Sequence, residues 1–492
     1  MSIRSSVLVA SLFFLICCCW AVSSPTGSSP DDEYHLQRIW CSSGDLNLCA
    51  QPSPGLIFLP KGIVGSACYA FNANLSADCQ REFFGTGEEF GSSERVIGAF
   101  YPSGYARVMS LLATTNVHAS VLVMRIFNSA LFALCSLAVS SLLKSELRKS
   151  LWMSLSFSLL PLGFFIIPSV NPSSWAFTSS ILGFFSLYGA ATSPNRKFQI
   201  LNGVNFFWFA ALGLLARSDS VLWITSSILI VGISKISFKH FAPMLRRVRT
   251  SKTNLFGFIL LPILFFASGL IFFLNTAGDQ ITFLGQGRTR DYWVPSLFQN
   301  FSNLPSLVLG SNGFGPLGWM DTPLPVAVST LWLLAFGLLL ARFFDASKRR
   351  EKNVLLLSWA GLCALIMVGL ARLGLVVGEI YQPRYFTPGV MLCIGLMCIP
   401  VSRKSSNMMD RSSRLTITVC LVVSMFLSIH TNLTRYTNGL ATKTLNPDPI
   451  WWRDGLPSPI VIAVISSGMF AFSLFFVLKT EKADDRKMHS QQ

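Results

Sequence analysis

Long apolar runs separated by polar connections make up most of this sequence. Most of the runs are close to the ~17–25 residues that cross the hydrocarbon core of a bilayer, so they predict about twelve membrane-spanning helices. A polar stretch rich in Gly, Ser and Pro, residues 24–115, follows the first run and is too long to be a turn. We expect spans at residues 7–21, 119–143, 151–168, 175–191, 200–216, 221–236, 255–274, 326–341, 354–377, 387–401, 415–429 and 459–478.

Basic residues mark every second connection between these spans. They lie within residues 144–149, 196–197, 235–252, 348–352, 403–414 and 479–486. Cytoplasmic loops of membrane proteins are enriched in Lys and Arg. This rule places the basic connections and both termini in the cytoplasm, and it makes the other connections face outward. The prediction is a multi-pass protein of the plasma membrane.

Composition agrees with a chain embedded in a lipid bilayer. Hydrophobic residues make up 51% of the sequence and charged residues 13%, whereas soluble proteins carry about 25% charged residues. The net charge of +16 is concentrated in the basic connections, so nucleic acid is not an expected partner. The predicted fold class is an all-α integral membrane protein with a large first extracytoplasmic loop.

The expected organisation has six parts. They are a first transmembrane helix or signal anchor (1–24), an extracytoplasmic acidic and cysteine-containing loop with an interfacial helix (25–118), helices two to seven (119–274), an extracytoplasmic loop (275–325), helices eight to twelve (326–478) and a cytoplasmic tail (479–492). The interfacial helix should begin near Tyr101 and Pro102. Residues 21–23 resemble a signal cleavage site, but we favour an uncleaved anchor, because it would tether the acidic residues that follow.

Cysteines divide into two groups. Eight of the twelve lie in apolar runs and are expected to be buried small hydrophobes. Cys41, Cys49, Cys68 and Cys79 lie in the first loop, where an outward location favours two disulfides. The three pairings are equally compatible with the sequence, and free thiols or a metal site are the alternatives.

An acidic motif follows the first span at Pro30-Asp31-Asp32-Glu33-Tyr34-His35. Adjacent carboxylates repel each other, which raises the pKa of one of them and suits it to general-base catalysis near neutral pH. Asp31 and Asp32 are the candidate catalytic residues, with Glu33 and His35 in support. The same acids could instead bind a divalent cation or simply be solvated.

Arginines on the predicted outward loops supply positive charge for a substrate. A guanidinium binds phosphate oxygens in bidentate geometry and stays charged, so a lipid phosphate or pyrophosphate is a natural ligand. Arg384 is the strongest candidate, and Arg288 and Arg290 are expected to assist it. The alternative for Arg384 is an interfacial arginine that snorkels to the membrane surface.

Asp321, Trp319 and Tyr385 are candidate substrate-binding residues. Asp321 could bind a sugar hydroxyl or the acceptor, or it could cap a turn before Thr-Pro. Trp319 could stack on a sugar or anchor the chain at the membrane surface, and Tyr385 is adjacent to Arg384. Arg125 lies inside a predicted span, where a charge needs a polar partner such as a first-loop carboxylate or another helix.

Four short motifs occur in order on the predicted outward connections. Together they resemble the pattern of a bacterial domain-of-unknown-function family of predicted polytopic membrane proteins, and the resemblance covers most of the chain. The motifs are Pro30-Asp31-Asp32-x-x-His35, Asn171-Pro172-Ser173-Ser174-Trp175, Gly318-Trp319-Met320-Asp321-Thr322-Pro323 and Gln382-Pro383-Arg384-Tyr385-Phe386.

That family is similar to the GT-C class of integral membrane glycosyltransferases, which use polyprenyl-phosphate-linked sugars and carry a catalytic carboxylate in the first outer loop. The resemblance implies a GT-C-like fold, with Asp31 or Asp32 as the base and Arg384 on the lipid phosphate. The family pattern has Glu where this chain has Asp32, so the catalytic acid stays open between the two. The cysteine-bearing loop does not match the family as a whole.

The leading hypothesis is an inverting glycosyltransferase that moves a sugar from a polyprenyl-phosphate donor to a cell-envelope glycan, lipid or protein on the outer side. No cofactor is required, although a divalent cation could assist. A transporter or flippase of lipid-linked saccharides is the second hypothesis, and a non-catalytic envelope-assembly protein is the third. The chain has no internal repeat and few charges inside its spans, which weakens the transporter hypothesis.

Overall fold

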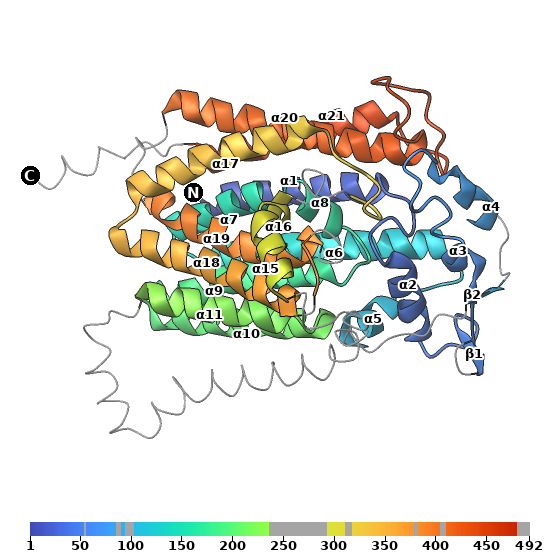
Figure 1. Cartoon of the computed structure of the whole chain (residues 1–492), viewed down its shortest axis with the longest axis horizontal. Helices are drawn as coiled ribbons and strands as arrows, with labels where there is room; N and C mark the ends of the chain where they lie inside the picture. The colour runs from blue at the N-terminus through green and yellow to red at the C-terminus, as the bar shows by residue number, and fades with distance from the viewer. Residues whose placement is uncertain are drawn as a thin grey trace, which may run out of the picture.

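Helices dominate the computed structural model and lie side by side along its long axis (Figure 1). The structure describes residues 1–53, 56–84, 90–93, 103–235, 293–309, 317–372, 374–377, 382–403 and 410–479. The small elements of the first loop gather at one end of the helical bundle, and the N-terminus lies at the other (Figure 1).

The N-terminal half supplies seven of the described bundle helices. They are α1 (Ile3–Val22), α6 (Val117–Leu142), α7 (Ser145–Ser158), α8 (Leu162–Ile166), α9 (Ser173–Thr192), α10 (Arg196–Ala216) and α11 (Ser220–Lys235). α1 packs against α6, α7 and α8 and against α21 from the far end of the chain. Phe13 of α1 contacts the rings of Trp152, Phe164 and Phe470 at centroid distances of 5.7, 5.6 and 6.4 Å. The first helix is therefore part of the central core.

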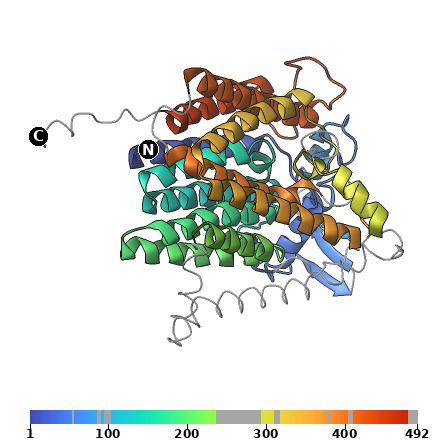
Figure 2. The same ribbon diagram turned by 60° about the vertical axis from the view of Figure 1, so that its left-hand side comes forward.

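The C-terminal half packs against this core, and its last helices lie along one side of it (Figure 2). Its described helices are α15 (Trp293–Ser302), α16 (Ser306–Leu309), α17 (Val326–Ala346), α18 (Arg349–Arg372), α19 (Pro383–Arg403), α20 (Arg411–Thr437) and α21 (Pro459–Leu478). α19 is the most enclosed of the long apolar helices described, because it packs against α7, α9 and α17 together.

The first loop folds into short elements. They are α2 (Asp32–Cys41), β1 (Ala50–Ser53), β2 (Leu56–Pro60), α3 (Lys61–Val64), η1 (Ala77–Cys79), α4 (Gln80–Phe84), β3 (Phe90–Ser93) and α5 (Ser103–Ser110). The strands form an antiparallel sheet in the order β1-β2-β3. Disulfides join Cys41 to Cys49 and Cys68 to Cys79, so the structure selects one of the three pairings. α5 occupies the place expected for an interfacial helix.

Eight described helices are long and apolar enough to span a membrane: α1, α6, α10, α17, α18, α19, α20 and α21. They confirm the all-α membrane fold. The span predicted at 151–168 is divided instead into α7 and α8, since Pro161 lacks an amide N–H and ends the helix before it. α9 and α11 coincide with two further predicted spans, but Ser and Thr lower the hydropathy of α9, and α11 has only 16 residues. The span predicted at 255–274 lies outside the described residues.

Short polar residues begin several long helices. The side chain of Ser2 accepts a hydrogen bond from the backbone N–H of Ser5 at 3.1 Å, and Asn116 accepts one from Ala119 at 3.0 Å. These caps satisfy amide groups that the first helical turn leaves without an intrahelical partner. Local sequence therefore sets the beginnings of α1 and α6.

Candidate active site

Asp31 lies at the start of α2, where its backbone adopts the left-handed conformation with φ of 63°. Asp is one of the few non-glycine residues that enter this region with some frequency. Its side chain does not cap α2 but accepts a hydrogen bond from Nη2 of Arg384. Nη1 of Arg384 donates to the Pro30 carbonyl at 3.1 Å. One guanidinium thus holds both the carboxylate and the backbone of the acidic motif.

The backbone carbonyl of Pro30 is also contacted by a third motif, the one that begins at Asn171. Nδ2 of Asn171 donates to this oxygen at 2.8 Å. Oδ1 of Asn171 accepts a hydrogen bond from the backbone N–H of Ser173, the first residue of α9, at 2.9 Å. The motifs that begin at Pro30, Asn171 and Gln382 therefore converge in space, although they lie hundreds of residues apart.

Tyr385 lies between two guanidinium groups. The Cζ atoms of Arg384 and Arg217 are 4.9 and 5.0 Å from the centre of its ring, and Nη2 of Arg384 donates to its hydroxyl at 2.9 Å. Arg217 is paired with Asp219 at 2.7 Å and donates to Oγ of Ser173 at 3.1 Å. The aromatic ring and its contacts bring a second cation close to Arg384.

Exposure distinguishes Asp31 from the arginine that it contacts. The Asp31 side chain is 42% exposed and the Arg384 side chain 3%. Burial raises the pKa of Asp31, but the charge and hydrogen bond of Arg384, with a further effect of Arg217, bring this pKa below its ordinary value. Asp31 is consequently an ionised, accessible carboxylate at neutral pH.

Asp32 has the opposite environment. Its side chain is completely buried and accepts hydrogen bonds from Oγ and from the backbone N–H of Ser29, the latter at 3.1 Å. Burial raises the pKa of Asp32 to about 6, against the opposing effects of Arg125 and Ser29. One acid of the pair does have a raised pKa, as the sequence predicted, but the main cause is burial, and repulsion from Asp31 is a smaller one.

The two supporting residues differ in burial. His35 is buried within α2. Burial lowers its pKa to about 3, with Arg384 and Arg217 acting in the same direction and Asp31 opposing them. His35 is therefore a neutral imidazole at pH 7. Glu33 lies in the first turn of α2 and is partly exposed.

Trp319 and Asp321 belong to a tight turn closed by a bridge between Leu317 and Thr322. Oδ2 of Asp321 accepts a hydrogen bond from Nη2 of Arg435 at 2.7 Å, in an ion pair whose carboxylate is 8% exposed. The indole Nε1 of Trp319 donates to the Gly27 carbonyl at 2.8 Å. The polar groups of both side chains thus serve contacts within the protein. Their role in substrate binding stays a prediction.

Met320, in the same turn, lies next to the acidic motif. This residue lines a cavity of about 10 Å³ together with Pro30 and Arg384. A space of that volume is smaller than a sugar.

Arg125 of α6 is buried and holds the chain between α1 and α2. Its guanidinium donates to the carbonyls of Ala21, Ser24 and Pro25, with distances of 3.2 Å to Ala21 and 2.7 Å to Pro25. The expected partner was a first-loop carboxylate or another helix. The bond to Ala21, a residue of α1, is the expected helix-to-helix contact, and the other two carbonyls follow that helix. Asp32 does not hydrogen-bond to the guanidinium but is near enough to interact electrostatically.

The predicted site is only partly assembled by the described residues. Asp31, Asp32, His35, Arg384 and Tyr385 come together, whereas Arg288 and Arg290 lie outside the described residues. Sequence reasoning counted Arg217 only among the cations of the outward loops, and it did not assign Asn171 or Ser173 to the site. Their signal was present, because all three lie in polar motifs on connections that were predicted to face outward.

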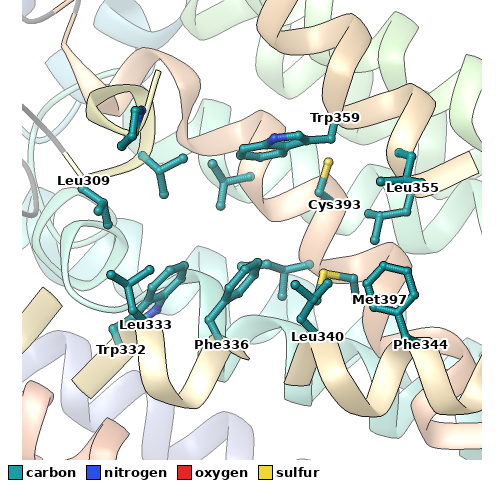
Figure 3. Close-up of a pocket in the computed structure, with 15 residues that line it drawn as sticks. Leu309, Trp332, Leu333, Phe336, Leu340, Phe344, Leu355, Trp359, Cys393 and Met397 are labelled. Carbon is teal, nitrogen blue, oxygen red and sulfur yellow. The ribbon is translucent and has the colours of Figure 1, made fainter. Parts of the chain in front are cut away.

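An apolar groove of about 350 Å³ lies among α16, α17, α18 and α19 (Figure 3). Trp332 and Phe336 of α17, Trp359 of α18 and Met397 of α19 are among the side chains that surround it. The ring of Trp359 also contacts Phe386 at a centroid distance of 5.7 Å. Phe386 follows Arg384 by two residues in α19, so Trp359 connects the groove to the same segment of that helix.

A family model described as predicted membrane protein (DUF2142) matches residues 13–393. This chain belongs to that family. The match includes Asp31, Asn171 and Arg384, and it confirms the family that the four motifs resemble. No curated protein and no solved structure matches the chain. Membership of the DUF2142 family supports a multi-pass membrane protein.

Proposed function

We propose that this protein is a membrane glycosyltransferase that transfers a sugar from a polyprenyl-phosphate donor to a cell-envelope acceptor on the outer face of the plasma membrane. The observation that carries the proposal is the contact between Asp31 and Arg384, which are 353 residues apart. It combines an accessible carboxylate with a buried guanidinium at the beginning of a membrane helix. A base and a phosphate ligand are the two groups that this reaction needs.

In the proposed step, the Asp31 carboxylate accepts the proton of an acceptor hydroxyl group. The hydroxyl oxygen attacks the anomeric carbon of the donor sugar, and the bond from that carbon to the phosphate oxygen breaks. The electron pair of this bond leaves with the polyprenyl phosphate, whose negative charge Arg384 stabilises. The displacement inverts the anomeric centre and requires no cofactor. A divalent cation near the acids would be an addition to this scheme.

Asp31 is preferred over Asp32 as the base. Asp31 is accessible and contacts Arg384, whereas Asp32 is enclosed and both of its oxygens accept hydrogen bonds from Ser29. Asp32 is therefore assigned a positioning role in the turn before α2. Arg288 and Arg290 remain predicted helpers on the phosphate, and Asp321 and Trp319 remain predicted sugar contacts.

Donor phosphate and Asp31 compete for the same guanidinium. While Arg384 holds Asp31, the pKa of the carboxylate is low and its basicity is weak. A phosphate bound to Arg384 would release Asp31 and neutralise the nearby positive charge. The pKa of Asp31 would then rise towards the range of an effective base. This competition favours an order in which the donor binds before the acceptor is activated.

The apolar groove supports a lipid-linked donor. Its lining consists of hydrophobic side chains from α16, α17, α18 and α19 (Figure 3), and its volume of about 350 Å³ falls within the usual range for ligand pockets. A prenyl chain in the groove would leave its phosphate beside Phe386 and Arg384. A soluble nucleotide-sugar donor would make no use of such a groove.

Sugar transfer by the purified protein in lipid tests the proposal. Radiolabelled sugars on synthetic polyprenyl phosphates are supplied with a panel of acceptors. We expect Asp31→Asn to reduce transfer by about 10²–10⁴-fold and Arg384→Ala by about 10²–10³-fold. Asp32→Asn should retain more activity than Asp31→Asn.

Asp45→Asn is the matched control, because Asp45 is an exposed acid in the same loop. Each variant is compared at equal folded concentration. Absence of transfer across the whole panel, or an Asp31→Asn variant as active as Asp45→Asn, would refute the proposed mechanism.

A further inference from the structure

A second charged cluster lies at the opposite end of the bundle from Asp31 and Arg384. α19 contains Arg384 near its beginning and Arg403 at its end, which are separated by roughly 28 Å of helix. This length is close to the ~30 Å thickness of the hydrocarbon core. The two clusters therefore belong to opposite faces of the membrane, and the second is on the face predicted to be cytoplasmic.

The second cluster is built from the ends of four helices. Nη1 of Arg403 is 2.8 Å from Oε1 of Glu351, and Nη2 of Arg403 donates to the Tyr188 hydroxyl. Nζ of Lys235 lies 4.2 Å from the centre of the Tyr188 ring. Arg350 donates to the backbone of α11, through the carbonyl of Ile233 at 2.6 Å. α9, α11, α18 and α19 are thus joined by polar contacts at one point.

A small cavity lies among these side chains and has two kinds of lining. Lys235, Arg350 and Glu351 supply its charged side, and Val354 and Leu396 belong to its apolar side. Its volume is about 30 Å³, close to that of one water molecule. One oxygen of a tetrahedral anion fits inside, while the rest of such a group would lie across the entrance.

Charge around the cavity is unbalanced. Among the described residues of the cluster, Lys235, Arg350 and Arg403 are cationic and Glu351 is the one carboxylate, so the net charge is about +2. Glu351 is also engaged by Arg403 and accepts a hydrogen bond from the backbone N–H of Lys348. Partly enclosed positive charge beside an apolar surface is complementary to an amphipathic anion.

We propose that this cavity binds the phosphate of an anionic phospholipid headgroup. The phosphate would contact Lys235 and Arg350, and the glycerol end of the lipid would lie on the apolar side. Basic pockets between membrane helices at the cytoplasmic face are suited to such headgroups. The bound lipid would link the ends of α11 and α18. This site is independent of the proposed glycosyl transfer, because it uses other residues on the other face.

Native mass spectrometry of the full-length protein in detergent tests the site. Phosphatidylglycerol and phosphatidylcholine are the two lipid probes. The wild type should retain phosphatidylglycerol in preference, and Lys235→Gln should reduce that retention by about five-fold. Lys144→Gln is the matched control, since it removes the same charge from an exposed position predicted on the same face, and it should leave retention unchanged.

A variant that should retain more phosphatidylglycerol shows that a loss of retention elsewhere is not simply a folding defect. Glu351→Gln removes the competing negative charge but keeps an acceptor for the Lys348 amide, so it should raise phosphatidylglycerol retention. Equal retention of the two lipids, or equal retention by Lys235→Gln and Lys144→Gln, overturns the proposal. Displacement of the lipid by an equal concentration of inorganic phosphate would assign the site to free phosphate and overturn the lipid assignment.

Discussion

Asp31 and Asp32 are adjacent in the chain, yet their carboxylates behave differently because α2 begins between them. The left-handed backbone of Asp31 directs its side chain to Arg384 and leaves it partly exposed. Asp32 is the first residue of the helix and is turned into the protein against Ser29. One dipeptide thus presents an ionised group to the site and buries an acid whose pKa is raised.

Asp31→Asn should increase the affinity of the protein for polyprenyl phosphate without a sugar. The substitution removes the negative charge that competes with the phosphate for Arg384. Because a partly exposed ion pair no longer has to be broken, we expect the affinity for the lipid phosphate to rise about five-fold, which corresponds to about 1 kcal/mol. Titration of the lipid phosphate into protein in nanodiscs measures this change.

The double variant Asp31→Asn with Arg384→Ala is the control for that gain, because it lacks the guanidinium and should lose the increase. Unchanged or weaker binding by Asp31→Asn would contradict the competition. This binding measurement does not require sugar transfer. It can therefore refute the competition between Asp31 and phosphate for Arg384 without refuting the proposed transferase activity.

Asp32 should make stability depend on pH in a defined direction. Its pKa is about 6 in the folded protein against an ordinary value of 3.8, so the folded state binds the proton more tightly than the unfolded state. The contribution of the protonated acid is present below about pH 4 and is lost as the pH rises to about 6. The full difference is about 3 kcal/mol.

Thermal unfolding of wild type and Asp32→Asn between pH 4 and pH 7 measures this effect. The Tm of the variant minus that of the wild type should increase across this interval, because only the wild type has to ionise a buried carboxyl group. Asp45→Asn, which removes an exposed acid from the same loop, is the control. A difference for Asp32→Asn that does not change with pH would show that the buried acid is not protonated preferentially in the folded state.

At the scale of elements, buried arginines attach the loops to the helices. Arg125 of α6 binds the carbonyl of Ala21 near the end of α1 and that of Pro25 beyond it. Arg435 of α20 is fully buried and donates to the carbonyls of Leu75 and Tyr69 as well as to Asp321. Because a guanidinium carries five donors, one side chain can join segments that have little apolar surface to share.

Arg435→Met should destabilise the protein strongly. It leaves the Asp321 carboxylate buried without its cation and removes donors from two carbonyls. Loss of one partner from a buried ion pair costs about 3–5 kcal/mol. Arg342→Met is the matched control, because Arg342 forms an ion pair with Asp410 in which the side chains are 27% and 54% exposed. It should cost at most about 1 kcal/mol.

Unfolding by detergent titration or heat measures both variants. Adding Asp321→Asn to Arg435→Met should recover part of the loss, since the unpaired charge is then gone. Equal stability of the Arg435 and Arg342 variants would mean that the buried arginine contributes little to joining α20 and the first loop.

At the scale of the whole molecule, the hydrophobic pattern predicted the all-α membrane fold correctly. Apolar runs of sufficient length have to become helices in a bilayer, because every backbone polar group must be satisfied within the segment. The pattern was less accurate at α7 and α8, where Pro161 divides a run that is apolar throughout. It also could not distinguish a helix facing lipid from one enclosed by protein, as in α9.

The sequence by itself determined the class of fold, eight of the twelve expected spans, the four motifs and the family. These are local properties, since they depend on hydropathy, length and short patterns. Tertiary structure decided which acid is accessible, which cysteines pair and which arginine meets Asp31. It also brought Arg217 and Asn171 to the site, and it paired Asp321 with Arg435. Several of these relations join segments more than a hundred residues apart, and the disulfide pairing is local but depends on how the first loop folds. Burial and the distance between charges exist only once the chain is assembled.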